Sequence, residues 1–172
     1  MTRTLNVVTR LRKPGLDRHA VEAAARKLVA LATPLAKRRG RAVFDRLDIV
    51  LHGDKASAEA HRAVMGVPTP TDVITVSYAA VPGAPAAAEL LVNPVEALRQ
   101  ALRRDAAVLL PEERGLAWSP DLELALYIAH GIDHLCGSDD ATPAGYRAMR
   151  RRELRWVRTL GPLSLFTEVP HA

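Results

Sequence analysis

The chain has few aromatic residues and a single cysteine, and both scarcities limit what it can do. Phe, Trp and Tyr make up 4% of its 172 residues, so stacking of nucleobases on exposed rings is not expected to be its main mode of binding. The lone Cys136 excludes an internal disulfide framework and suits a reducing cytosol. The sequence also lacks a run of about 18 apolar residues, the length needed to span a membrane, and a signal-peptide pattern at its start. These absences predict a cytoplasmic protein that does not enter a membrane.

Basic residues outnumber acidic ones. The chain carries 24 Lys and Arg against 19 Asp and Glu, its net charge is +5 and its pI is about 9.9. This balance favours a polyanionic partner, although an arginine-rich solvated surface would give the same numbers. With 172 residues, 48% of them hydrophobic, the chain can form one domain with a sizeable core. We expect this domain over residues 1–160, followed by a loosely held C-terminal tail over residues 161–172.

The hydrophobic pattern predicts an α+β fold with about four strands in a mixed sheet and four or five helices. Strands are expected where apolar and polar residues alternate or β-branched residues cluster. Helices are expected where apolar residues recur at helical spacing behind capping residues such as Asp17, Asn93 and Ser119. The predicted strands cover residues 5–9, 47–51, 73–78 and 89–93, and the predicted helices cover 18–31, 56–65, 94–104, 120–135 and 141–160, with a basic loop at 37–41.

The clearest chemical pattern is the segment 130–140, His-Gly-Ile-Asp-His-Leu-Cys-Gly-Ser-Asp-Asp. His130 and His134 are four residues apart, so on a helix they point to the same side. Gly137 allows the helix to end in a left-handed turn that brings Asp139 or Asp140 back towards the histidines. Two imidazoles and one carboxylate leave a fourth position open on a zinc ion, as in catalytic zinc sites. The alternative is an ordinary helix face followed by a solvated acidic turn.

This segment resembles the motif of the YbeY endoribonucleases, which are bacterial rRNA maturation factors. Their pattern is His-Gly-x-Leu-His-Leu-x-Gly-Tyr-Asp-His, and the chain departs from it at Asp133, at Ser138 and at Asp140, which replaces the third zinc-binding histidine. Residues 66–75, Gly-Val-Pro-Thr-Pro-Thr-Asp-Val-Ile-Thr, resemble the family segment Gly-x-x-x-Pro-Thr-Asp-Val-Leu-Ser. The resemblance covers roughly residues 44–158. Met65 stands where the family has an arginine thought to act in catalysis.

The resemblance implies a metal-dependent, single-strand-specific endoribonuclease acting in rRNA maturation and ribosome quality control. Residues 1–160 would form a YbeY-like metallohydrolase domain, and the partner would be rRNA or the small ribosomal subunit. The cofactor would be one zinc ion per chain, with another divalent metal as the alternative. Its ligands would be His130, His134 and, by the family pattern, Asp140 rather than Asp139. A carboxylate can replace imidazole on zinc, with changed affinity or metal preference.

Further residues are candidates for roles in metal-assisted hydrolysis of an RNA phosphodiester. Arg62, one helical turn before Met65, is the candidate cation for the transition state, although a surface arginine is the simpler interpretation. Asp133 would orient a ligand histidine, be exposed, or act as general base. Arginines on one side of the last predicted helix form a ridge that either follows a phosphate backbone or is simply solvated. The candidates in this ridge are Arg147, Arg151 and Arg155.

Two other functions fit parts of the pattern. A non-catalytic, ribosome-associated RNA-binding protein would explain the altered third ligand and Met65. A small zinc peptidase would share the histidine spacing of the His-Glu-x-x-His motif, but Gly131 stands in place of its catalytic glutamate. Ribonuclease activity is therefore the leading prediction, and the oligomeric state is left unpredicted.

Overall fold

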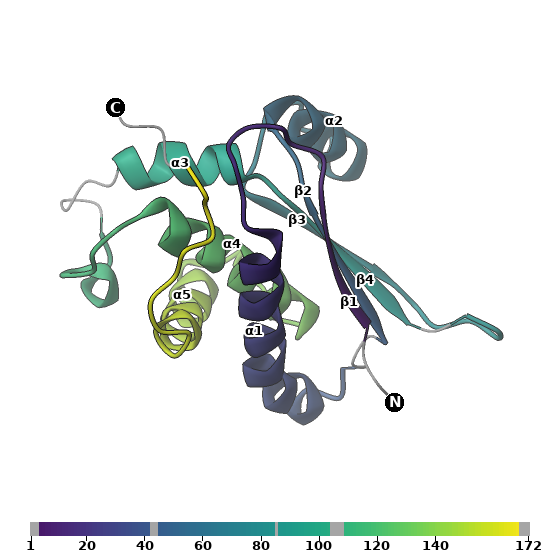
Figure 1. Ribbon diagram of the computed structural model, residues 1–172. Helices are drawn as coiled ribbons and strands as arrows, with labels where there is room; N and C mark the ends of the chain where they lie inside the picture. The colour runs from purple at the N-terminus through teal and green to yellow at the C-terminus, as the bar shows by residue number, and fades with distance from the viewer. Residues whose placement is uncertain (1–3, 42–44, 85, 104–108, 169–172) are drawn as a thin grey trace.

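The computed structural model describes residues 4–41, 45–84, 86–103 and 109–168 (Figure 1). The chain forms β1 (Thr4–Thr9), α1 (Arg18–Arg38), β2 (Arg46–Leu51), α2 (Asp54–Met65), β3 (Val73–Tyr78), β4 (Ala87–Val92), α3 (Pro94–Arg103), the short 3-10 helix η2 (Pro111–Glu113), α4 (Pro120–Leu135) and α5 (Pro143–Arg158). This order of strands and helices confirms the predicted α+β class in a single small domain.

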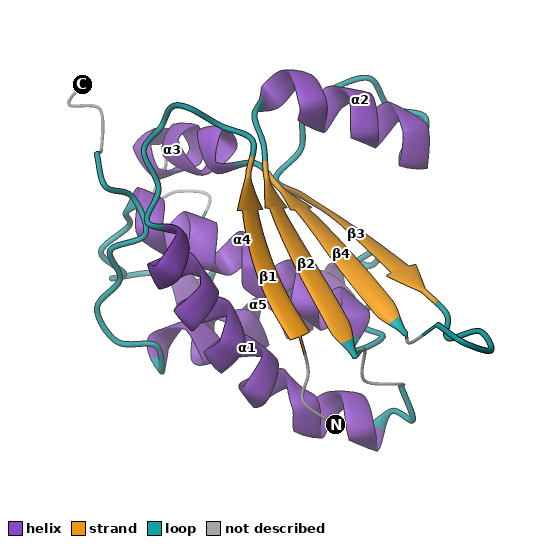
Figure 2. Cartoon of the chain, turned by 45° about the vertical axis from the view of Figure 1, so that its right-hand side comes forward, coloured by secondary structure: helices purple, strands orange, loops and turns teal. Residues whose placement is uncertain are grey.

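The four strands form one sheet in the order β1-β2-β4-β3. β1, β2 and β4 are parallel and β3 is antiparallel to β4, so the sheet is mixed, as predicted. Because side chains alternate between the two faces of a strand, Leu47, Ile49 and Leu51 of β2 point to the same face, where all three are fully buried. Helices α1, α4 and α5 lie on one side of the sheet (Figure 1), and α2 lies beyond the ends of the strands (Figure 2).

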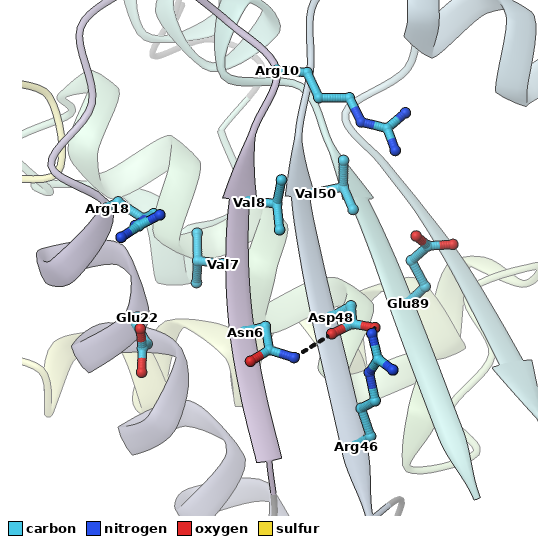
Figure 3. Close-up of a pocket in the computed structure, with 10 residues that line it drawn as sticks. All are labelled: Asn6, Val7, Val8, Arg10, Arg18, Glu22, Arg46, Asp48, Val50 and Glu89. Atoms are coloured by element: carbon cyan, nitrogen blue, oxygen red, sulfur yellow. Dashed lines mark hydrogen bonds and ion pairs between the residues drawn. The ribbon is translucent and has the colours of Figure 1, made fainter. Parts of the chain in front are cut away.

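The other face of the sheet carries polar side chains (Figure 3). Asn6 Nδ2 donates a hydrogen bond to Asp48 Oδ1 at 2.8 Å, and Arg46 pairs with the same carboxylate at 2.7 Å. These residues and Glu89 line a pocket of about 520 Å³. None of the predicted site residues lines this pocket. The two predicted histidine ligands, His130 and His134, belong to α4 on the helical side of the sheet.

Helix α4 is the centre of the helical layer. It packs against α1, α3, α5, β3 and β4, and every residue from Leu124 to Ala129 is buried, as expected for a helix surrounded on several sides. Ser119 caps its start, since its Oγ accepts a hydrogen bond from Leu122 N at 3.1 Å. After the helix, Gly137 adopts a φ of +79°, the left-handed conformation predicted for it. The histidine motif therefore lies on a central helix.

Helix α1 is longer than predicted. It continues past Leu31 to Arg38 because Ala32 and Ala36 extend the buried stripe at a spacing of four residues. Lys37 and Arg38 form its last turn, where positive charge interacts favourably with the helix dipole. The predicted basic loop at 37–41 is therefore wrong for these two residues.

The prediction of a loosely held tail is wrong for residues 161–168. Leu165 and Phe166 are only 1% and 5% exposed. Asp121 Oδ1 accepts hydrogen bonds from the backbone amides of both residues, and Leu165 O accepts one from Asp17 N at 2.8 Å. Residues 169–172 and the predicted helix end near residue 104 lie outside the described part of the chain. None of the described helices is both long enough and apolar enough to cross a lipid bilayer.

Candidate metal centre

The two histidines of α4 and Asp140 converge on one point. His130 Nε2 lies 3.0 Å from His134 Nε2 and 3.5 Å from Asp140 Oδ2, and His134 Nε2 lies 3.8 Å from Asp140 Oδ1. A tetrahedral zinc ion with bonds of about 2.0–2.1 Å places its ligand atoms about 3.4 Å apart. The three predicted ligands could therefore hold such an ion. Asp139 lines the same pocket as these residues but is not one of the three whose ligand atoms converge, and its Oδ1 accepts a hydrogen bond from Ala141 N at 2.9 Å.

Hydrogen bonds at the opposite ring nitrogens orient both imidazoles. His130 Nδ1 lies 2.8 Å from Glu153 Oε1, and His134 Nδ1 lies 3.1 Å from the backbone oxygen of Ser138. A carboxylate and a carbonyl accept hydrogen bonds, so both Nδ1 atoms act as donors. In the neutral imidazole each Nε2 atom then carries the lone pair that would bind a metal ion. A proton or a metal ion between the two Nε2 atoms, which lie 3.0 Å apart, relieves the repulsion of these lone pairs. This donor arrangement is typical of metal-binding histidines.

Glu153 of α5 is the functional residue that sequence analysis missed. Its side chain is buried, and Arg150 Nη1 lies 3.8 Å from its Oε2. Burial lowers the pKa of His130, but the hydrogen bond to Glu153 and the charges of Glu153, Asp72 and Asp140 together raise this pKa above its usual value. A signal existed in the sequence: Glu153 is four residues from both Met149 and Val157, which places an acid on the buried side of the helix.

Asp133 lies away from the point where the ligands converge. It is fully buried, its Oδ1 accepts a hydrogen bond from Ser138 Oγ at 2.5 Å, and its Oδ2 pairs with Arg152 at 2.8 Å. Arg152 Nη2 also donates to Ser138 Oγ at 2.9 Å. Asp133 therefore anchors the loop whose Ser138 carbonyl orients His134. Asp133 and Ser138 are two of the positions at which the chain departs from the family motif, and here they contact each other.

Two pockets meet at the cluster. One, of about 650 Å³, is lined by residues of α2, β3 and α4, including His61 and Met65. The other, of about 470 Å³, shares Thr71, Asp72, His130 and Asp140 with the first. The cluster therefore borders both pockets. Arg62, the predicted catalytic cation, is exposed and lines neither pocket, although its neighbour His61 lines the larger one.

The predicted arginine ridge on α5 is exposed and partly neutralised. Arg147, Arg151 and Arg155 all face solvent, and Arg151 lies 3.4 Å from Glu112 of η2. Other arginines of the same helix turn inward: Arg150 pairs with Glu113 at 2.5 Å. Acidic residues of η2 therefore offset part of the positive charge of this helix. Tyr146 of the same helix is 43% exposed.

A side chain at Gly131, between the two histidines, would force neighbouring side chains to shift. A Cβ atom there would lie 2.7 Å from Leu90 Cδ2 and 3.2 Å from Thr75 Oγ1. Helix α4 therefore packs directly against β3 and β4 at the level of the ligands. A His-Glu-x-x-His peptidase needs a glutamate at this position, and here a glutamate would require Leu90 to shift.

Comparison with known proteins agrees with this geometry. Residues 7–161 match the family described as Endoribonuclease YbeY. An Endoribonuclease YbeY of Anaeromyxobacter sp. (strain Fw109-5) is 31% identical over 139 residues, which are 80% of this chain and 66% of that protein. The Endoribonuclease YbeY of Anaeromyxobacter dehalogenans (strain 2CP-C) is 34% identical over 138 residues, 80% of this chain and 65% of that protein. The protein of the same name from Rhodopirellula baltica is 45% identical over 49 residues, 27% of this chain and 25% of that protein.

The chain spans slightly less than two thirds of the length of these Anaeromyxobacter relatives, at 66% and 65%. The family match extends from β1 to beyond the end of α5 and includes the whole His-His-Asp cluster. The chain therefore belongs to the YbeY endoribonuclease family.

Proposed function

We propose that the chain is a metal-dependent endoribonuclease that cleaves single-stranded RNA in rRNA maturation and ribosome quality control. The observation that carries the proposal is the cluster of His130, His134 and Asp140, in which the donor atoms lie within 4.8 Å of one another at the meeting of two pockets. The relatives named as endoribonucleases support RNA as the substrate. We further propose zinc as the metal, with another divalent ion as the alternative, rRNA or the small ribosomal subunit as the partner, and the cytoplasm as the location.

The side chains in and around the cluster would have two different roles, binding the ion and orienting its ligands. His130, His134 and Asp140 would hold the ion, while Glu153 and the Ser138 carbonyl keep both Nε2 atoms directed at it. When bound, such an ion acts as a Lewis acid and lowers the pKa of a water molecule to about 7. An unpaired strand can bend to enter both pockets, whereas a duplex is a stiff rod. This difference supports single-stranded RNA as the substrate.

An RNA cleavage assay tests the proposal. Zinc-loaded protein is incubated with an end-labelled single-stranded RNA and with the same strand in a duplex. We expect cleavage of the single strand only, and loss of that cleavage in His134→Ala because one ligand is removed. His19→Ala is the matched control, since His19 is exposed on α1 and lines neither pocket of the cluster.

The same assay separates the alternatives. RNA binding without cleavage by both the wild type and His134→Ala would support a non-catalytic RNA-binding protein. Equal cleavage by both proteins would show that the activity does not depend on the cluster. Metal analysis of the purified proteins accompanies the assay, with about one zinc per chain expected in the wild type.

A further inference from the structure

One arginine lines the larger pocket together with the residues of the His-His-Asp cluster. Arg41 is the single Lys or Arg among the described residues that line this pocket of about 650 Å³. It follows α1, and its backbone N–H donates to Ala36 O at 3.0 Å, which ties its position to the end of that helix. Arg41 belongs to the basic segment 37–41, which the sequence alone left without a role.

The guanidinium of Arg41 lies against the loop that carries the third ligand. A Cβ atom built on Gly137 would lie 2.6 Å from Arg41 Nε and 3.3 Å from its Cζ and Nη2. The missing side chain at Gly137 therefore leaves the space that the guanidinium takes. Gly137 lines the same pocket, between His134 and Asp140 in the sequence. The positive charge thus lies beside the polypeptide that joins two of the ligands.

The charge of Arg41 is available to an anion. In the described ranges of the chain, no acidic side chain forms an ion pair with it. Its neighbours differ: Arg39 donates to Ser138 Oγ at 2.5 Å, and Arg152 pairs with Asp133 at 2.8 Å. Arg39 and Arg152 both form hydrogen bonds with Ser138 in the loop after α4. Arg41, in contrast, is exposed and lines the pocket.

We propose that Arg41 binds the phosphate of the RNA beside the His-His-Asp cluster and stabilises the negative charge that develops on this phosphate during cleavage. In hydrolysis a P–O bond to the water oxygen forms, the P–O bond to the leaving ribose oxygen breaks, that oxygen takes a proton from the water, and no atom changes oxidation state. In the transition state the extra negative charge lies on the phosphate oxygens, and the paired N–H groups of a guanidinium match two of these oxygens. The inference rests on the proposed ribonuclease function, and it moves the role predicted for Arg62 to Arg41.

Three variants test this role. Arg41→Met removes the charge, Arg41→Lys keeps the charge without the paired donors, and Arg38→Met is the matched control. Arg38 is an exposed residue in the same basic segment, so its loss changes the net charge equally, but it does not line the pocket. Metal content and thermal unfolding of each variant show whether the cluster and the fold are intact.

Single-turnover cleavage of a saturating single-stranded RNA gives the first readout. We expect Arg41→Met to cleave about 100-fold more slowly than the wild type, and Arg41→Lys to recover part of that loss. Arg38→Met should stay within about twofold, because an exposed charge outside the site is screened by salt. Wild-type rates in Arg41→Met, or an equal loss in Arg38→Met, would overturn the proposal.

RNA affinity gives a second readout that does not depend on cleavage. Anisotropy of fluorescein-labelled single-stranded RNA is measured over a range of salt, with all variants made in the His134→Ala background. Arg41→Met should reduce the slope of log affinity against log salt by about 0.7, the value for one lost contact to a single-strand phosphate. An unchanged slope would contradict the contact. If the wild type fails to cleave, the ribonuclease function fails, and this slope still decides whether Arg41 contacts phosphate.

Discussion

At the scale of single residues, the buried position of Cys136 lowers the reactivity of its thiol. The side chain is 4% exposed, and burial, with a smaller effect from the charge of Asp133, raises the pKa of its thiol to about 11. The thiol is therefore protonated at pH 8, and the thiolate is the reactive form. We expect a thiol-reactive disulfide reagent to modify the folded protein very slowly. In denaturant the same reagent should react rapidly with one thiol per chain. Rapid modification of the folded protein would contradict the burial.

Glu153 makes a second prediction at this scale. In Glu153→Gln the carboxylate that accepts the His130 Nδ1 hydrogen bond at 2.8 Å becomes a neutral amide. Loss of such a partner behind a metal-binding histidine typically lowers metal affinity by about 10–100-fold. Competition for zinc with a coloured chelator measures this affinity. Glu59→Gln, at an exposed position of α2, is the control and should bind zinc as the wild type does; equal affinities in both variants would contradict the role.

The individual site residues were predictable to different degrees. The spacing of His130 and His134 was enough to place both on one side of a helix, and the family motif was needed to prefer Asp140 over Asp139. Glu153 and the partners of Asp133 were not found. The spacing of Glu153 could have placed it on the buried side of α5, but its contact with His130 and that of Arg152 with Asp133 depend on how α4 and α5 pack, which no local pattern in the sequence contains.

At the scale of elements, the contact between α4 and the sheet depends on Gly131. We expect Gly131→Ala to destabilise the protein by about 1–3 kcal/mol through overpacking, because the new methyl group would lie 2.7 Å from Leu90 Cδ2. Helix propensity alone predicts the opposite, a gain of about 1 kcal/mol for alanine. Urea unfolding measures the difference in the free energy of unfolding.

A double-mutant cycle isolates this contact. Leu90→Val removes the Cδ atoms that the new methyl group would meet, so alanine at position 131 should cost less in the Leu90→Val background than in the wild type. Additive effects of the two substitutions would show that the instability of Gly131→Ala has another origin.

Elements were predicted best where the pattern is periodic. The alternation in β2 and the cap at Ser119 both gave elements that the structure contains. The end of α1 was wrong although Ala32 and Ala36 continue the helical spacing, because the predicted apolar stripe was ended at Leu31. The C-terminal segment was wrong for another reason. Leu165 and Phe166 are buried by contacts with distant parts of the chain, and a short apolar pair carries no periodic signal of its own.

At the scale of the whole molecule, the proposed ion would join α4 to the loop after it and so stabilise the fold. We expect removal of zinc by a chelator to lower the free energy of unfolding of the wild type by about 2.7 kcal/mol relative to protein kept at a zinc concentration of 100 times Kd. Thermal unfolding with and without the chelator measures this loss. His134→Ala should unfold at the same temperature in both conditions, and a chelator effect of equal size in that variant would contradict the cluster as the binding site.

Two adjacent residues of α5 make the hydrogen bonds that hold the two histidines in their orientations, one directly and one through a loop. Glu153 holds His130 directly, and Arg152 holds the loop that orients His134. During synthesis α4 leaves the ribosome before α5, and domains fold as their chains emerge. The nascent chain therefore exposes both imidazoles before either has its support. The centre can therefore be completed only after α5 has been synthesised and has packed against α4.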